Sequence, residues 1–331
     1  MKAFSLFAQP LVVATVVAFA TTVSAQLTPG PRYGHEMVFD EARGTTLLFG
    51  GFLSDGSPVG DTWSWNGESW TLLSESGPGP RKWAAATYDS RRRVVVMFGG
   101  REGVGRSGVS LAETWIWDGT EWRNTGVTGP SGRDHHRLAY DTNRDRVVLF
   151  GGWDGERVVG DTWEWDGGQW HHVASHGPAP RAPFGMVYHD ALDAIVVMGG
   201  KDLEQTFSDI WTWDGSQWTE LEMQGPGARS FHAMTFDRDA GRAIVFGGRQ
   251  DDHLLRDLWS WDGAVWKRLD NTGPLRRGMH ASVYDPIRKC LVIHGSGDRV
   301  DGKWVLESST WTWNDDAGWT DVSPAIESQT R

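Results

Sequence analysis

Six arginines at nearly constant spacing are the side chains of this sequence whose number and type point most clearly to chemistry. They are Arg32, Arg81, Arg133, Arg181, Arg229 and Arg277. A guanidinium group binds carboxylates and other oxyanions through paired hydrogen bonds. Two alternatives follow: the arginines pair with acids of a neighbouring repeat or with loop carbonyls, or some of them stay free to bind an anion. The acids available for pairing are Asp61, Glu113, Asp161, Asp209 and Asp257.

Carboxylate and imidazole side chains lie close to two of these arginines in the sequence. Asp134 and His135 follow Arg133 directly, and Glu36 lies four residues after Arg32. A carboxylate or histidine beside an arginine is the arrangement that acid–base catalysis on an anionic substrate needs. Asp134, His135 and Glu36 are therefore the candidate catalytic residues.

The remaining histidines and the single cysteine do not predict a metal site or a cofactor. Four histidines share one repeat position that is Ala84 or Phe184 in other repeats, which indicates a packed position; they are His35, His136, His232 and His280. His171 and His172 are neighbours on a predicted strand, so their side chains point to opposite faces. One cysteine, Cys290, excludes a disulfide framework and a thiolate cluster, and its apolar neighbours predict a buried thiol.

Internal repeats explain where these side chains come from. Glycine pairs begin at Gly50, Gly99, Gly151, Gly199 and Gly247, a degenerate sixth begins at Gly295, and the spacings are 49, 52, 48, 48 and 48 residues. Counted from the first glycine, position −18 is always arginine, −21 always proline, and −11 always tyrosine or phenylalanine. Downstream, the copies resemble Asp161–Trp170, DTWEWDGGQW, so that 18 of the 21 tryptophans belong to the repeat.

Each repeat predicts four short antiparallel strands and no helix. An apolar, β-branched run ends at the glycines, tryptophans then alternate with period two, and Asp-Gly or Asn-Gly marks a tight hairpin. Four strands cannot bury both of their faces alone, so the repeats must stack on one another. Antiparallel order places the arginine and the loop after the glycines on the same side of every repeat.

These features resemble the kelch family, whose marks are an apolar run into a double glycine, a later Trp or Tyr, and a period near 50 residues. The resemblance implies an all-β, six-bladed kelch-type β-propeller over residues 26–322, after a signal peptide at 1–25 and before a tail at 323–331. The expected blades are 29–76, 77–128, 129–176, 177–224, 225–273 and 274–322. The sixth blade departs most, with His294, Ser296 and Ser309 in place of repeat residues. No strand is left over to cross the seam, so closure is expected to rest on face packing.

Residues that break the repeat are better binding candidates than residues that packing already explains. The spare tryptophans Trp83, Trp153 and Trp304 join the six arginines as the predicted ligand-binding residues. Glu36 and Arg137 stand where the other repeats have Ala or Gly. The loops 101–112 and 297–308, at twelve residues, are the longest on the arginine-bearing face. Loops on a rigid scaffold are the usual place for binding.

The N-terminus and the overall charge limit the location and the partners. Lys2, an apolar stretch at 11–20 and the small residues before Ala25 predict a secretory signal peptide, so we expect an extracytoplasmic protein cleaved after Ala25. Cleavage removes Lys2 and changes the net charge from −11 to −12. That charge argues against nucleic acid as a partner, and no other segment could span a membrane.

Two functions of different classes remain. We favour a monomeric binding module that holds a protein segment, a glycan or a small anion on the arginine-bearing face, without a cofactor. The alternative is a secreted carbohydrate-acting enzyme, which the resemblance implies because the kelch-like architecture also hosts sialate mutarotases and copper-radical oxidases. Of these, the mutarotase type is favoured, because an oxidase needs a tyrosine linked to a cysteine and only Tyr33 is free of the repeat.

Overall fold

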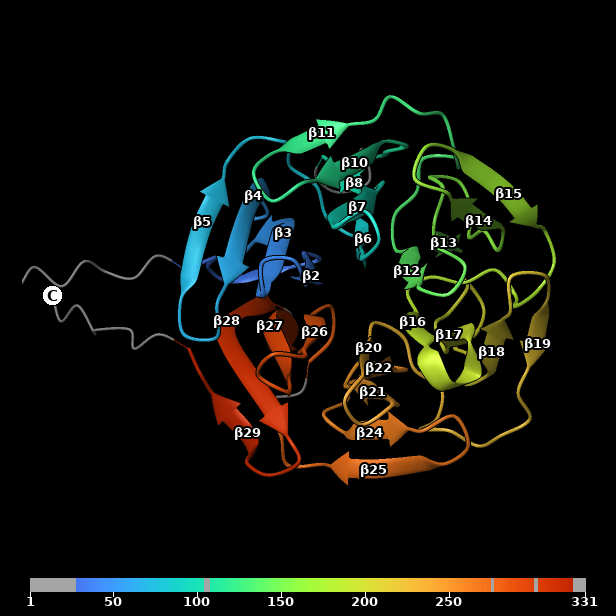
Figure 1. Ribbon diagram of the computed structural model, residues 1–331. Coiled ribbons are helices and arrows are strands. Elements are labelled where there is room, and N and C mark those ends of the chain that lie inside the picture. Colours follow the sequence, from blue (N-terminus) through green and yellow to red (C-terminus); the bar gives the residue numbers. More distant parts are fainter. Residues whose placement is uncertain (1–27, 104–107, 275–276, 301–302, 324–331) are drawn as a thin grey trace, which may run out of the picture.

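The fold is a closed ring of six antiparallel sheets around a central channel (Figure 1). The computed structural model describes residues 28–103, 108–274, 277–300 and 303–323. It confirms the predicted all-β propeller with six four-stranded blades. The predicted signal peptide at 1–25 lies outside the described residues. Within the part of the chain that the structure describes, no helix has the length and apolar character needed to cross a bilayer.

Each blade contributes one strand to each of four concentric layers (Figure 1). The innermost strands are β2 (Glu36–Asp40), β6 (Ala85–Asp89), β12 (Arg137–Asp141), β16 (Gly185–His189), β20 (Ala233–Asp237) and β26 (Ala281–Asp285). The second strands are β3 (Thr45–Leu53), β7 (Val94–Phe98), β13 (Arg146–Phe150), β17 (Ala194–Met198), β21 (Arg242–Phe246) and β27 (Cys290–Val300). The third strands are β4 (Pro58–Trp65), β10 (Thr114–Trp117), β14 (Thr162–Trp165), β18 (Ile210–Trp213), β24 (Leu258–Trp261) and β28 (Lys303–Asn314). The outer strands are β5 (Trp70–Ser74), β11 (Trp122–Asn124), β15 (Trp170–Ala174), β19 (Trp218–Glu220), β25 (Trp266–Asp270) and β29 (Gly318–Asp321).

Short elements lie at the ends of the blades. Strand β1 (Arg32–Tyr33) pairs with β3, and the hairpins β8 (Arg101–Glu102) with β9 (Val109–Ser110) and β22 (Arg249–Gln250) with β23 (His253–Leu254) lie in loops. One turn of 3₁₀ helix covers Asp190–Leu192.

The repeat tryptophans join the blades to one another. The indole of an outer strand donates to a threonine in the third strand of the preceding blade, for example Trp170 to Thr114 at 2.8 Å. Trp70 donates to Thr310 at 3.0 Å and carries the same bond across the seam between the last and first blades. In the fourth and fifth blades the threonine is replaced by Ile210 and Leu258. The indole nitrogens of Trp266 and Trp319, which would face these residues, then have no hydrogen-bond partner.

On the face opposite the arginine-bearing loops, a second set of arginines links neighbouring blades. At position −7, Arg43, Arg92 and Arg288 each donate to a carbonyl in the tight turn of the next blade. The acceptor for Arg288 is Asn66 of the first blade, so this contact also crosses the seam. In the fourth blade the residue is Leu192, which lies over Gly263 of the fifth blade. Closure rests on such contacts between faces, and each blade is built from its own segment of chain.

The double glycines are required by the packing between blades. Gly151 has φ +66°, and a Cβ there would meet the ring of Phe184 and the carbonyl of Arg181 from the next blade. A Cβ on Gly152, at φ +104°, would meet His136 of its own blade. In the second to fifth blades each glycine pair therefore lies between two side chains of position −15, one from its own blade and one from the next.

The sixth blade differs from the sequence-based prediction. Residues 297–308 were expected to form a loop, but β27 and β28 continue as one paired hairpin from Ser296–Glu307 to Val300–Lys303. A bulge between His294 and Ser296 lets the ladder resume after the degenerate glycine position. The first blade behaves in the same way although it keeps both glycines: β3 resumes its pairing with β4 at Gly51–Val59 after a similar bulge.

Candidate functional site

All six repeat arginines lie on one face of the propeller, together with the loops that follow the glycines. Each guanidinium donates to the carbonyl of the first glycine of its repeat at 2.8–3.1 Å. The six side chains are almost completely buried. The structure therefore brings these predicted binding residues to one face but places them beneath its surface.

Five of the six arginines form ion pairs with the repeat acid. Arg181, for example, binds Asp209 with two hydrogen bonds of 2.6 and 2.7 Å, and the same carboxylate accepts from Trp211. The acid was expected to belong to a neighbouring repeat, and this detail is wrong. It opens the third strand of the same sheet, where the second strand ends at the glycines, so it lies next to its own arginine.

Replacement of Ser309 by aspartate is expected to stabilise the sixth blade. Arg277 is buried and donates to Ser309 Oγ at 2.6 Å, at the position where the other five blades have an acid. Burial lowers the pKa of Arg277 to about 10, against the opposing charges of Glu307 and Asp321. A carboxylate at this position should raise the free energy of unfolding by about 1–3 kcal/mol, the size of a hydrogen bond to a charged group. Thermal unfolding of S309D checks this, with S309N as the uncharged control; equal midpoints would contradict it.

The mouth of the channel, on the same face, is formed by one residue from each blade. These residues, at position −16, are Gly34, Trp83, His135, Pro183, Phe231 and Met279, and we call them the mouth ring. Backbone hydrogen bonds run from blade to blade around it, as from Trp83 N–H to the Gly34 carbonyl at 2.7 Å and from His135 N–H to the Trp83 carbonyl at 3.1 Å. Gly34 N–H donates to the Met279 carbonyl and continues the ring across the seam.

The backbone of the mouth ring is strained at the four residues that are neither glycine nor proline. Trp83, His135, Phe231 and Met279 have φ between +55° and +59°. A residue with a Cβ adopts this left-handed conformation at a cost of roughly 1–2 kcal/mol, and Gly34 shows that glycine fits the same position. Strain of this kind concentrates at functional sites. The large side chains at the mouth therefore point to a role beyond folding.

Replacement of Phe231 by glycine and by alanine separates backbone strain from side-chain contacts. Both variants lose the ring that lies 5.8 Å from His135 and 5.5 Å from the Lys201 ammonium, but only glycine relieves the left-handed strain. We expect F231G to have a free energy of unfolding about 1 kcal/mol above that of F231A. Chemical denaturation of the two variants measures this difference. If F231A were as stable as F231G, the strain would be absent.

Aromatic and cationic side chains pack together at the mouth. Trp83 stacks on His135 with ring centroids 3.9 Å apart. The Lys82 ammonium lies 3.9 Å from the ring centroid of Phe52 and 4.1 Å from that of Trp83, a cation–π arrangement. Burial, and then the charge of Arg101, lowers the pKa of Lys82 to about 8.

Asp134 and His135 are in direct contact, as their adjacency suggested. His135 Nδ1 is 2.5 Å from Asp134 Oδ1, and Ser110 Oγ donates to Asp134 Oδ2 at 2.9 Å. Burial raises the pKa of Asp134, but the bonds from His135 and Ser110 and the charge of Arg101 outweigh it and lower the pKa overall. Burial lowers the pKa of His135, and its Nε2 has no hydrogen-bond partner.

A second set of cations surrounds the mouth ring. In each of the first five blades, position +2 after the first glycine pairs through its backbone with position −17. Lys82 stands at position −17 of its blade, and Arg101, Lys201 and Arg249 stand at position +2 of theirs, so that all four lie on the same rim. Trp153 lies on this rim too, in a bridge with Asp134. Trp304 lies elsewhere, on the sixth-blade hairpin opposite Arg299. The sequence alone did not single out Arg101, Lys201 and Arg249, although their shared repeat position could have done so.

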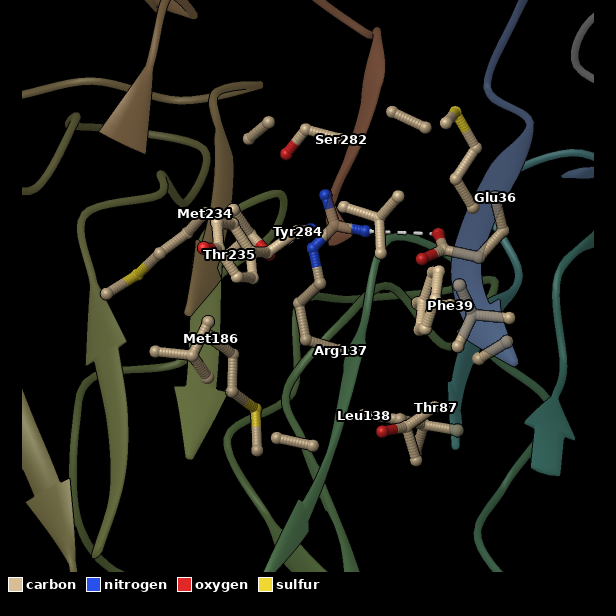
Figure 2. Close-up of a pocket in the computed structure, with 18 of the residues that line it drawn as sticks. Glu36, Phe39, Thr87, Arg137, Leu138, Met186, Met234, Thr235, Ser282 and Tyr284 are labelled. Atoms are coloured by element: carbon tan, nitrogen blue, oxygen red, sulfur yellow. Dashed lines mark hydrogen bonds and ion pairs between the residues drawn. The ribbon is translucent and has the colours of Figure 1, made fainter. Parts of the chain in front are cut away.

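Below the mouth, the channel holds an ion pair between blades that are not adjacent. Arg137 of β12 reaches toward Glu36 of β2, with 3.7 Å between Nη1 and Oε2 (Figure 2). The Nε of Arg137 donates to the Phe184 carbonyl at 3.0 Å. Burial raises the pKa of Glu36 to about 7, against the opposing charge of Arg137. About a fifth of the Glu36 side chain is still accessible from inside the channel.

The channel is small and is bridged at its other end. Its volume is about 230 Å³, below the roughly 300–1,000 Å³ of pockets for drug-sized ligands. Glu41 of the first blade and Arg238 of the fifth form a 2.6 Å ion pair near the end opposite the mouth. Access from the arginine-bearing face therefore leads to Glu36 and Arg137 first.

The histidines of position −15 are packed between blades rather than gathered into a site. His35, His136, His232 and His280 are all buried, and burial lowers the pKa of each. Among the residues that the structure describes, no group of three or more His, Cys, Asp or Glu side chains could hold a metal ion. Cys290 is buried as predicted, and burial raises the pKa of its thiol to about 12.

Comparison with known proteins agrees with this architecture. The profile of the KLHDC2/KLHL20/DRC7 kelch-repeats domain matches residues 16–167, 69–214 and 164–325. An F-box/kelch-repeat protein of Arabidopsis thaliana is 33% identical over 143 residues, which are 38% of this chain and 28% of that protein. The aligned part is thus less than a third of the plant protein's length. Because the profile matches cover most of the chain, the protein belongs to the kelch-repeat family.

Proposed function

We propose that the protein is an extracytoplasmic binding module that holds an acidic segment of a partner protein at the mouth of its channel. A kelch propeller suggests protein binding in general terms. The observation that supports this particular site is the set of partly exposed basic side chains on the rim, Arg101, Lys201 and Arg249, on a chain with net charge −11. Lys82 is buried, and acids lie near two of these cations: Asp134 at 3.5 Å from Arg101 and Asp252 at 2.7 Å from Arg249. A group of positive charges on a protein with negative net charge attracts an anionic partner and orients its approach.

The surroundings of the mouth fit a protein partner better than a bare ion. Trp83 and Phe231 supply aromatic surface in a strained backbone conformation, and Trp residues are frequent anchors of protein interfaces. Farther out, Val109 and Leu203 are exposed apolar side chains between the second and third strands of their blades, and Val305 is exposed in the extended hairpin of β27 and β28. A partner that reaches from the mouth to these segments would cover polar and apolar surface together.

Charge reversal at the rim tests the proposal. Wild-type protein is screened against a random peptide library, and the enriched peptides are expected to carry acidic residues. We expect the double variant K201E/R249E to bind the selected peptides at least tenfold more weakly, since two attractions become repulsions. The matched control is R123E/K267E, which reverses two exposed cations on the outer strands β11 and β25. Equal loss in both double variants, or enrichment of uncharged peptides, would contradict the proposal.

The same proposal includes secretion and a monomeric state. Residues 1–25 support secretion because they have the charge and apolar pattern of a signal peptide. A glycan or a small anion that carries carboxylates would contact the same cations. The proposal therefore includes such a ligand in place of a protein segment.

A carbohydrate-acting enzyme is the second candidate, and one specific observation favours it. The raised pKa of Glu36 beside Arg137, below the Asp134–His135 pair, gives the channel a group that exchanges protons near neutral pH. A mutarotase-like activity would appear as faster interconversion of sialic acid anomers in NMR spectra. If the protein is such an enzyme, the faster interconversion should disappear in E36Q or H135Q. If the wild-type protein does not accelerate the interconversion, this activity is excluded.

A further inference from the structure

Glu36 and Arg137 stand at a repeat position that has only a small residue in the other blades. At position −14 the remaining four blades have Ala85, Gly185, Ala233 and Ala281. These four residues are buried, whereas the Arg137 side chain extends into the channel toward Glu36 (Figure 2). The fold itself does not need this pair, because four blades form without a charge at this position.

The ion pair is incomplete. The distance of 3.7 Å between Arg137 Nη1 and Glu36 Oε2 is too long for a hydrogen bond, whereas the repeat arginines approach their carboxylates to 2.6–3.0 Å. One donor of Arg137 is satisfied by the Phe184 carbonyl. The edge of the guanidinium that faces the channel thus has room for a better-placed carboxylate, and a planar guanidinium binds carboxylate in two-bonded geometry.

We infer that the channel beneath the mouth ring is a binding site for a single carboxylate group, which replaces Glu36 as the partner of Arg137 while Glu36 takes up a proton from solvent. Two carboxylates this close to one arginine cannot both stay ionised without strong repulsion. The hydroxyls of Thr87, Thr235 and Ser282, which also line the channel, supply further polar surface (Figure 2). A channel of about 230 Å³ accepts a side chain or a small acid rather than a large ligand.

The other titratable groups that line the channel leave Glu36 as the group that changes charge near neutral pH. They are His35, Glu41, Tyr88, His135, Arg137, Tyr140, Tyr188, Arg238, His280 and Tyr284. Burial lowers the pKa of each of these histidines and raises that of each of these tyrosines. Glu41 and Arg238 are paired with each other at the far end.

Calorimetric titration with propionate, and with propionamide as the uncharged control, tests the site. Wild-type protein is expected to bind propionate and not propionamide. Measured in phosphate and in Tris at pH 8, where Glu36 is largely ionised, each propionate should bring about one proton with it. Affinity should fall roughly tenfold for each pH unit above 7, as linkage to one proton requires.

Two alanine variants make the result specific. R137A should lose propionate binding, and E36A should bind it with no proton uptake and no pH dependence between 7 and 9. Alanine is the natural residue at Ala85, Ala233 and Ala281, so both variants should fold, and their thermal midpoints verify this. Equal binding of propionate and propionamide, unchanged binding by R137A, or proton uptake that persists in E36A would each overturn the carboxylate site.

The carboxylate could be a free acid or could belong to the partner in the proposed function. A blocked peptide with one glutamate, compared with its glutamine counterpart, distinguishes these sources. Binding of propionate but not of the peptide supports a free acid, and tighter binding of the glutamate peptide than of propionate supports the partner. The rim variant K201E/R249E should weaken the peptide and leave propionate unchanged, so failure of the rim proposal is visible separately from failure of the carboxylate site.

Discussion

Lowering the pH from 7 to 5 should remove several kcal/mol of the free energy of unfolding. Among the described residues six histidines are buried, and burial lowers the pKa of each, His189 included. The pKa is lowered to about 3 for His35 and His280 and well below its usual value for His136, His232 and His294. In the unfolded chain their pKa returns to about 6.5. Below pH 6.5 the unfolded chain binds more protons than the fold, so stability is complete above that pH and is lost as pH falls toward 3.

The expected loss is large because the histidines act together. Each histidine with a strongly lowered pKa contributes about 2 kcal/mol at pH 5, at about 1.4 kcal/mol per pH unit. Glu36 acts in the opposite direction: its pKa is raised to about 7, so its contribution is present at low pH and is lost as pH rises through 7. This offsets about one histidine. The net loss in the free energy of unfolding approaches the whole stability of an ordinary domain. Urea denaturation at pH 7, 6 and 5 measures this loss.

The fourth blade provides the control for this prediction. Phe184 occupies the histidine position there and lies over Gly151 as His136 lies over Gly99. H136F and H232F should therefore fold at pH 7, and each should recover about 2 kcal/mol of the loss at pH 5. If neither variant changed the acid dependence, the buried histidines would not be its cause.

Replacement of Arg181 by methionine should cost about 3–5 kcal/mol, the loss typical of a buried ion pair from which one partner is removed. Arg181 has no exposed surface and bonds the carbonyls of Ala179 and Gly199 as well as the Asp209 carboxylate. Methionine fills part of the space but leaves Asp209 and these carbonyls without their donor. Denaturation of R181M measures the loss.

The sixth blade separates the ion pair from the other bonds of the arginine. Arg277 also bonds a glycine carbonyl, but its third-strand partner is Ser309 rather than an acid. R277M should therefore destabilise the propeller less than R181M does. Equal losses would show that the carbonyl bonds, and not the charge pair, account for the effect.

The repeat spacing was sufficient to predict the fold and the common face of the arginines. Each arginine lies 18 residues before its glycine pair and therefore at the start of the first strand of its repeat. Because every repeat has the same strand order, this places all six arginines on one face without knowledge of distant contacts. The same comparison of repeats singled out Glu36, Arg137 and Trp83, because each departs from the residue that packing would prefer at its position. Glu36 and Arg137 proved to face each other, and Trp83 proved to lie on the mouth ring.

Contacts between blades could not be predicted in the same way. The stacking of Trp83 on His135, and the proximity of Arg137 to Glu36 two blades away, depend on the curvature of the closed ring. The partner of each repeat arginine was placed in the wrong repeat for a related reason. Spacing gives the order of strands but not how far a long side chain reaches within its own sheet.

The circumference of this propeller is not equally stiff everywhere. The junction of the fifth and sixth blades has Leu258 and Ala240 in place of the bonding threonine and arginine, but the Arg242–Asp315 ion pair joins these two blades. Between the fourth and fifth blades Ile210 likewise leaves the Trp266 nitrogen without an acceptor, and Leu192 stands where four of the blades carry an arginine. Separation of the disc should thus begin there, where mostly apolar contacts hold adjacent sheets together, and thermal fluctuations would vary the bore of the channel from that one side.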